Sequence, residues 1–243
     1  SEAWNEQLSR IKATFRTERE RRIFYTAMYH FMIAPQTWCD VSGDYMGADL
    51  KVHRGAKYEM LTTWSLWDTY RAAHPLATII MPDRMPDYAK TMMAIFREHG
   101  ELPMWHLTSN ETYCMVGEPG IPVLADMILK NECGDINLKE AYEAMKASLL
   151  PTEYSEVHRL PLRGKDYLAH LGFLPYDGRE GETVAKNLEY YLASWAVAQV
   201  AGRLGYKQDS IRFYNLSQNY RKLWDQRVKC MRAIDSKGNL RPL

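Results

Sequence analysis

One segment of the chain, residues 182–204, limits the possible folds more than any other. It contains the string TVAKNLEYYLASWAVAQVAGRL and is followed by Gly205, so the sequence predicts one long helix that ends at this glycine. The segment is mostly apolar between residues 184 and 200, and a helix of that composition is buried on most of its surface. Burial of this kind is expected of an inner-ring helix in a toroid of helix pairs.

Helical periodicity recurs along most of the chain. Apolar residues repeat at steps of three and four in residues 2–32, and Pro35 ends that pattern. Further helices are expected in residues 65–80, 83–99, 119–129, 138–150 and 209–225. Residues 35–62 are rich in Gly and Asp and indicate a long loop or short hairpins, and residues 152–178 are irregular. The chain is therefore expected to be all-α, with roughly seven or eight helices in antiparallel pairs.

Composition and charge exclude several classes of function. The 243 residues suffice for one large domain or two small ones. They carry 31 Lys and Arg against 30 Asp and Glu, and this net charge of +1 offers nucleic acid or acidic membranes no long-range attraction. No apolar run approaches the ~20 residues that span a bilayer. Dinucleotide-binding, P-loop, zinc-protease and G-x-S-x-G motifs do not occur in the sequence, so these chemistries lack their usual signals.

The N-terminal residues and the cysteines bear on the cellular compartment. The chain opens with SEAWNEQLSRIKATF, which has no signal-peptide pattern, so the sequence as given carries no export address. Its four cysteines lie far apart without a C-x-x-C pair, which argues against a zinc knuckle or a redox motif. Buried free thiols are the ordinary state of such residues, and a disulfide between one pair stays open as an alternative.

Glu111 is the first candidate for chemistry. It stands in the string PMWHLTSNETYCMVG, close to the aromatic and thioether side chains of Met104, Trp105 and Tyr113. A carboxyl group held against such surface loses hydration of its charged form, so it can keep a proton near neutral pH, as a general acid must. The Asn-Glu-Thr triplet around Glu111 is also an N-glycosylation sequon, and a solvated loop or cap residue is the competing interpretation.

Tryptophans beside loops are candidates for stacking on a sugar ring. They are Trp38, Trp64, Trp67 and Trp105. Asp68 and His106 stand next to two of them in the sequence and could bind sugar hydroxyl groups. Burial in the core is the competing interpretation for each tryptophan, because most tryptophans of globular domains are buried.

Several carboxylates suggest metal or ion-pair roles. Three of them, Asp40, Asp44 and Asp49, form a loose set of oxygen ligands, but without EF-hand spacing a turn held by Asx side chains is favoured. Glu182 and Glu189 are seven residues apart and so share one face of the long helix. Glu189 stands among Leu and Tyr residues, where a buried carboxylate needs a metal or, more commonly, a Lys or Arg partner.

Five strings, in order, carry a family resemblance. They are FYTAMYHFMIAP, DVSGDYMGAD, SLWDTYRAAHPL, SNETYCMVG and EGETVAKNLEYYLASW, and the match extends over nearly the whole chain from about Ile23. Together they resemble glycoside hydrolase family 92, the calcium-dependent, exo-acting α-mannosidases. The resemblance implies a catalytic domain of (α/α)6 type, an N-terminal β-sandwich domain, and hydrolysis of terminal α-mannosides with inversion, the α-1,2 type being expected.

The same resemblance implies roles for individual residues. Glu111, in the NET string, matches the general acid of the family, and Glu189 corresponds to a position near the bound calcium. The implied substrate contacts are Trp67, Asp68, Trp105 and Glu182. These roles fit the chemistry, because inverting hydrolysis needs a protonated carboxyl group and a second carboxylate roughly 6.5–9.5 Å away. Calcium suits the vicinal hydroxyls of a mannose ring because it prefers oxygen ligands.

The chain also departs from the family pattern. The base carboxylates of the family lie in a Gly-Asn-Asp/Glu-Asp-like motif near a Met-Ser-Ala-Trp string, and the 243 residues contain neither. Ala193 and Ser194 stand where the family has an acidic pair. Residues 1–243 are therefore expected to be a partial (α/α)6 catalytic domain that lacks the β-sandwich domain, the C-terminal part of the toroid and the general base. Such a fragment is expected to be inactive alone.

The resemblance also implies a biological setting. It indicates a secreted or periplasmic parent protein that acts on α-mannoside glycans, including N-glycans, in carbohydrate metabolism. The oligomeric state stays open. A non-catalytic helical carbohydrate-binding or interaction module on the same scaffold is the alternative function, and a different (α/α)6 hydrolase such as a glucosidase is a third hypothesis.

Overall fold

The computed structural model describes residues 2–155, 157 and 160–243. Most of the secondary structure in these residues is helical. The α-helices are α1 (Glu2–Leu8), α2 (Glu18–Met32), α3 (Leu66–Thr69), α4 (Ala73–Ile80), α5 (Met85–His99), α6 (Gly120–Lys130), α7 (Leu138–Leu149), α8 (Pro151–Tyr154), α9 (Lys165–Leu171), α10 (Thr183–Arg203) and α11 (Lys207–Ser217). Two 3-10 helices, η1 (Pro82–Arg84) and η2 (Gln218–Leu223), follow α4 and α11. The prediction of a helical chain is confirmed, whereas the closed ring of helix pairs stays a prediction.

Short strands connect the helices. Their bounds are β1 (Gln36–Thr37), β2 (Tyr45–Met46), β3 (Val52–His53), β4 (Leu61–Thr62), β5 (Trp64–Ser65), β6 (Trp105–Leu107), β7 (Asn110–Glu111), β8 (Trp224–Asp225) and β9 (Cys230–Met231). All pairs are antiparallel: β1 with β4, β2 with β3, β5 with β6, β6 with β7, and β8 with β9. Residues 35–62 therefore form hairpins, one of the two structures expected for them. None of the described helices is long and apolar enough to cross a membrane.

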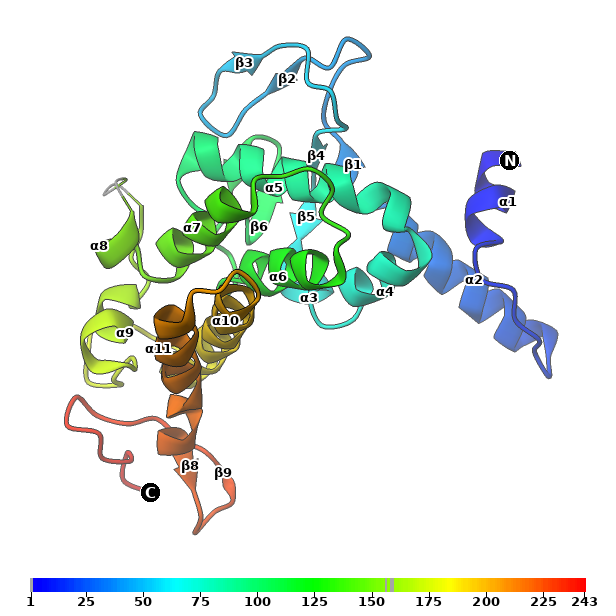
Figure 1. Cartoon of the computed structure of the whole chain (residues 1–243). Helices are drawn as coiled ribbons and strands as arrows, with labels where there is room; N and C mark the ends of the chain where they lie inside the picture. Colours follow the sequence, from blue (N-terminus) through cyan, green and yellow to red (C-terminus); the bar gives the residue numbers. More distant parts are fainter. Residues whose placement is uncertain (1, 156, 158–159) are drawn as a thin grey trace.

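The N-terminal helical pattern is divided into two helices, α1 and α2, where the sequence predicted one. The division follows from a capping box at the start of α2. Thr17 Oγ1 accepts a hydrogen bond from Glu20 N at 3.2 Å, and the Glu20 carboxylate accepts one from Thr17 N at 3.1 Å. These two bonds satisfy backbone donors that would otherwise be unpaired at a helix start, so they favour a new helix at this point. Figure 1 shows α1 and α2 extending away from the other helices.

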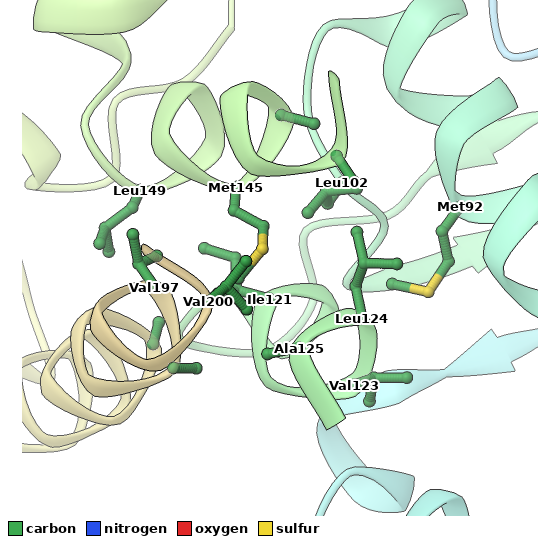
Figure 2. Packing of buried hydrophobic residues seen from close by; sticks show 14 of the residues in the cluster. Met92, Leu102, Ile121, Val123, Leu124, Ala125, Met145, Leu149, Val197 and Val200 are labelled. Atoms are coloured by element: carbon green, nitrogen blue, oxygen red, sulfur yellow. The ribbon is translucent and has the colours of Figure 1, made fainter. Parts of the chain in front are cut away.

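The core forms where α10 packs against α6, α7 and α11 (Figure 1). Figure 2 shows Val197 and Val200 of α10 facing Met145 and Leu149 of α7, with Ile121 of α6 beside them. All five side chains are at most 2% exposed. The expectation that the long apolar helix is largely internal is therefore confirmed. One side of α10 remains open to solvent, because Trp195 is 45% exposed.

A three-stranded sheet, β5–β6–β7, lies beside the helical core and links the first half of the chain to the NET string. In its register, Trp64 is paired with His106, and His106 with Glu111. The turn between β6 and β7 has two residues, Thr108 and Ser109, with φ angles of 41° and 55°. The sheet places Glu111 at an edge, directly before the loop that runs to α6.

Candidate functional site

Three segments that are far apart in the sequence meet at Glu189 of α10. The Tyr70 hydroxyl, just after α3, donates a hydrogen bond to Glu189 Oε2 at 2.8 Å, and Arg71 Nη2 donates one to Oε1 at 2.9 Å. The third segment is the loop after β7: a Cβ atom placed on Gly117 would lie 2.5 Å from Glu189 Cβ. The loop backbone therefore packs directly on Glu189, and Gly117, with a φ of 86°, is suited to both the contact and the conformation.

Arg71 also joins Glu189 to Trp67, the first residue of the Trp-Asp-Thr (WDT) part of the string SLWDTYRAAHPL. The Arg71 Cζ atom lies 4.3 Å from the Trp67 ring centroid and 4.4 Å from that of Tyr70. Trp67 is half-buried, whereas Asp68 and Arg71 are exposed. We call Trp67, Tyr70, Arg71 and Glu189 the Glu189 cluster. It combines an aromatic surface with charged groups on one face, the combination used to bind a sugar ring and its hydroxyls.

Burial controls the electrostatics of the Glu189 cluster. It raises the pKa of the Glu189 carboxyl group, and the hydrogen bonds from Tyr70 and Arg71 offset only part of this effect. Burial also raises the pKa of the Tyr70 hydroxyl, and the hydrogen bond to Glu189 raises it further. The sequence predicted that a buried carboxylate at position 189 would have either a metal or a Lys or Arg side chain as its partner. The structure shows the second kind of partner, Arg71.

The residues around Glu189 do not fit a calcium ion by themselves. Calcium takes six to eight oxygen ligands, whereas the Glu189 carboxylate is already paired with a cation, because its Oε1 lies 2.9 Å from the Arg71 guanidinium. Among the described residues, the group of three metal-ligating side chains that lie close together is Asp49, His53 and Glu98, which does not include Glu189. Calcium at Glu189 is therefore not supported by the surrounding side chains.

Glu111 is buried, with 6% of its surface exposed, and its carboxylate binds the backbone of its own segment. Oε2 accepts hydrogen bonds from Met104 N at 2.8 Å and Trp105 N at 3.2 Å. Oε1 accepts from Trp105 N at 3.0 Å and Tyr113 N at 3.1 Å. The three residues whose side chains suggested an apolar setting thus contribute backbone N–H donors. These bonds tie the two ends of the β6–β7 hairpin together.

His106, between Trp64 and Glu111 in the sheet, is completely buried. Neither ring nitrogen has a hydrogen-bond partner among the described residues. Burial lowers the pKa of His106 to about 4, so its ring is neutral at physiological pH. Its position in the interior favours a packing role over the sugar-hydroxyl role considered from the sequence. Trp64 is also buried, as the competing interpretation for the tryptophans anticipated.

A buried network of charged groups holds the segment that carries Glu111. Lys165 Nζ donates hydrogen bonds to Glu101, to Glu118 Oε1 at 2.9 Å and to Ser148 O at 3.0 Å. Glu101 and Glu118 stand at the two ends of this segment, so one ammonium group binds both ends. Arg163 Nη2 donates to Met115 O at 2.8 Å and Nη1 to Glu118 Oε1 at 3.3 Å. Burial raises the pKa of the Glu118 carboxyl group, although Lys165 and Arg163 oppose the shift.

The structure unites some of the residues selected from the sequence and separates others. Trp67, Asp68 and Glu189 belong to one region, and Trp105 is joined to Glu111 through its backbone N–H. Glu182 lies apart from them: it is the exposed N-cap residue of α10, with a φ of 54°. Seven residues of helix separate it from Glu189, roughly 10 Å along the axis.

Sequence reasoning missed Tyr70, Arg71, Arg163, Lys165 and the two glutamates that Lys165 binds. Tyr70 and Arg71 stand inside the string SLWDTYRAAHPL, directly after the residues that were selected. The helical spacing of this string would have placed them near Trp67. Arg163 and Lys165 lie in the irregular region 152–178, where no periodicity indicates which charged side chains point inward.

Comparisons with known proteins identify the family of the chain. The glycosyl hydrolase family 92 catalytic domain model matches residues 1–243. A family GH92 α-mannosidase from Bacteroides thetaiotaomicron, solved in complex with mannoimidazole, is 34% identical with a TM-score of 0.88, and the match covers 98% of this chain and 30% of that chain. A GH92 inverting mannosidase from the same organism is 30% identical with a TM-score of 0.88, over 100% of this chain and 33% of that chain. No curated protein matches. The chain spans about a third of the length of these solved relatives.

Proposed function

The chain belongs to glycosyl hydrolase family 92, and from this premise we propose that it is part of the catalytic domain of an exo-acting, inverting α-mannosidase of the α-1,2 type. The substrate would be a terminal α-mannoside of a glycan, including N-glycans. Two solved relatives, an α-mannosidase bound to mannoimidazole and an inverting mannosidase, support this assignment. A secreted or periplasmic location is proposed with it.

The convergence of the WDT string, the loop after β7 and α10 at Glu189 is the observation that carries this proposal. Three of the five family-like strings supply the residues that touch there. The exposed Asp68 and Arg71, beside the half-buried ring of Trp67, provide a surface on which a mannose ring can stack and bind through its hydroxyls. In this role Glu189 is a positioning residue, because it fixes the Arg71 guanidinium. Trp105 and Glu182 are proposed as more distant substrate contacts.

Two roles for Glu111 follow from different arguments. The resemblance assigns it the general acid, which must carry a proton and lie next to the leaving oxygen. The hydrogen bonds from three backbone N–H groups favour a different role, in which the carboxylate organises the hairpin beside the Glu189 cluster. We propose the second role, since the carboxylate oxygens are directed to the backbone of their own segment.

The remaining parts of the mechanism are assigned to the whole domain. Inverting hydrolysis needs a carboxyl pair that leaves room for one water molecule, and we propose that the base carboxylate lies outside residues 1–243. Calcium, which would polarise mannose hydroxyls when bound, is likewise proposed for the whole domain. Because Glu189 is occupied by Tyr70 and Arg71, no step of the reaction is derived through a metal at this residue.

The experiment that tests these roles compares two substrates in the complete natural protein that contains these residues. For the general-acid role, Glu111→Gln should reduce hydrolysis of a mannobiose about 10²-fold or more and spare a dinitrophenyl mannoside, whose leaving group needs no proton. For the organising role, Glu111→Gln should affect both substrates by a similar factor and lower the melting temperature. Glu6→Gln, at an exposed glutamate of α1 that is placed in no binding role, is the matched control.

Substrate class is tested with Arg71→Met. Loss of mannoimidazole binding, measured well below the melting temperature of the variant, would support the sugar-binding role of the Glu189 cluster, and unchanged binding would contradict it. The isolated 243-residue chain should hydrolyse no α-mannoside, and turnover well above background would overturn the assignment of the base to another part of the protein. Mannose binding by the complete protein without any hydrolysis would instead favour the carbohydrate-binding module.

A further inference from the structure

We propose that Asp49, His53 and Glu98 form a binding site for a first-row transition-metal cation of the zinc type. The three side chains come from the β2–β3 hairpin and from the last turn of α5, on which the hairpin rests (Figure 1). One ligand atom from each lies within 4.8 Å of the other two. The site is separate from the Glu189 cluster and does not depend on the proposed mannosidase function.

The spacing of the ligand atoms agrees with a small tetrahedral cation. His53 Nε2 lies 3.0 Å from Asp49 Oδ1 and 3.7 Å from Glu98 Oε1. A tetrahedral zinc ion with metal–ligand bonds near 2.0–2.1 Å keeps its ligand atoms roughly 3.3 Å apart. Both distances from His53 Nε2 are thus within a few tenths of an ångström of this spacing, and the two carboxylate atoms lie within 4.8 Å of each other. The fourth position would be left for water.

The donor set distinguishes zinc-type cations from calcium. One imidazole and two carboxylates suit zinc, cobalt or nickel, whereas calcium and magnesium prefer oxygen ligands alone. The exposure of the side chains would let a cation enter, because His53 is 36% and Asp49 20% exposed. The site is thus expected to discriminate against the cation that the family resemblance implies.

The surroundings of Glu98 indicate that its charge needs a partner. Its side chain is only 5% exposed, and among the described residues His53 is the basic side chain within 4 Å of it. Glu98 Oε1 accepts a hydrogen bond from the Tyr45 hydroxyl at 2.7 Å, and Oε2 one from Ala48 N at 2.8 Å. A carboxylate held in this way by uncharged donors is oriented toward His53 and Asp49, as a pre-formed ligand would be.

The His53 ring is also fixed in position. It stacks on Tyr45, its partner across the hairpin, with ring centroids 5.1 Å apart and planes 13° from parallel. A Cβ atom on residue 47 would lie 2.7 Å from His53 Nε2 and 2.8 Å from Asp49 Oδ1, so the glycine at this position leaves the space between the two ligand atoms open. Packing of this kind reduces the reorganisation that metal binding would require.

Zinc titration of the complete natural protein tests the proposal. Any bound metal and the affinity tag are removed first. Calcium is then added at a saturating concentration and kept there, so that the sites that prefer calcium are filled before zinc is titrated. Calorimetry should then show that wild type binds one more equivalent of zinc than His53→Gln. Asp49→Asn should weaken this equivalent at least tenfold. Zinc should also raise the melting temperature of wild type but not that of His53→Gln.

A histidine outside the proposed metal site serves as the control for the zinc titration. His170, an exposed residue of α9, is the matched control, and His170→Gln should keep the full zinc stoichiometry. Equal zinc stoichiometry in wild type and His53→Gln would overturn the proposal. So would an unchanged affinity in Asp49→Asn, a substitution on the solvent side of the site that leaves Glu98 and its hydrogen bonds intact. In either case His53 would only bridge the two carboxylates through hydrogen bonds.

Discussion

Tyr70 and Glu189 are 119 positions apart in the sequence and are joined by a 2.8 Å hydrogen bond. The bond attaches the segment after α3 to the middle of α10, the helix around which the core is built. Because Arg71 binds the other oxygen of the same carboxylate, one half-buried side chain orients two consecutive residues of the SLWDTYRAAHPL segment. The geometry of the proposed sugar-binding face is therefore expected to depend on contacts made beneath it.

Tyr70→Phe removes the hydroxyl donor without changing the ring. The free energy of unfolding should fall by about 1–2 kcal/mol, since a hydrogen bond to a charged, half-buried carboxylate is lost. Urea unfolding measures the change. Tyr29→Phe is the control, because Tyr29 is 42% exposed and its substitution should change the value by less than about 0.5 kcal/mol. Equal effects of the two substitutions would show that the bond to Glu189 contributes no stability.

Gly117→Ala should destabilise the protein through two separate effects. The alanine would strain a backbone with a φ of 86°, and its Cβ would lie 2.5 Å from Glu189 Cβ. Gly205→Ala separates the two effects, since Gly205 has a φ of 85° but no atom within 4 Å of an added Cβ. We expect a loss of about 1 kcal/mol for Gly205→Ala and at least twice that for Gly117→Ala. Equal losses in urea unfolding would mean that the loop moves away from Glu189 at no cost.

The helix boundaries were predictable where a local signal fixes them. A helix was expected over residues 138–150, and directly before it the Asn137 side chain accepts a hydrogen bond from Glu140 N at 3.1 Å. A helix was expected to end at residue 99, and Gly100, which follows it, has the left-handed conformation, with a φ of 101°. The β6–β7 hairpin was not expected, because its turn residues Thr108 and Ser109 adopt positive φ angles that are usually left to Gly or Asn. Sequence-based reasoning therefore lacked a signal at this turn.

The site was predicted as a set of residues but not as an arrangement. Glu189 was expected to need a partner, and the need follows from its apolar neighbours in sequence. The identity of that partner, Arg71, depends on how α3 packs on α10, which periodicity does not determine. For Glu111, in contrast, the neighbouring residues were predicted and the type of contact was not. Its neighbours Met104 and Trp105 are close in space as expected, but the strand pairing turns their N–H groups toward its carboxylate.

Lys165→Met should be among the most destabilising substitutions. Lys165 is completely buried and binds Glu101 and Glu118. Its loss leaves Glu101 buried without a charged partner, at an expected cost of about 3–5 kcal/mol in the free energy of unfolding. Lys165→Met combined with Glu101→Gln should recover part of this loss, because the uncompensated charge is removed. Urea unfolding tests both, with exposed Lys139→Met as the control. A double variant as unstable as the single one would assign the loss to packing.

The two buried histidines should make stability fall as the pH is lowered. Burial lowers the pKa of His74 to about 3 and that of His106 to about 4, whereas both titrate near 6.5 in the unfolded chain. The unfolded state therefore binds more protons below pH 6.5, and each histidine should reduce the free energy of unfolding by up to about 1.4 kcal/mol per pH unit. These two histidines leave the free energy of unfolding at its full value above pH 6.5, and they lower it progressively as the pH falls toward 4 and below.

His106→Phe isolates one of these contributions. Phenylalanine is similar in size, and no hydrogen bond is lost, because neither ring nitrogen of His106 has a partner among the described residues. Denaturant unfolding between pH 6.5 and 5 should show a mean slope lower than that of wild type by about 1 kcal/mol per pH unit. This range lies above the ordinary pKa values of Asp and Glu, which keeps most carboxylates ionised throughout.

His170→Gln, at an exposed position, should leave the slope unchanged. Parallel profiles for His106→Phe and wild type would show that the buried ring binds its proton as readily in the folded protein as in the unfolded chain.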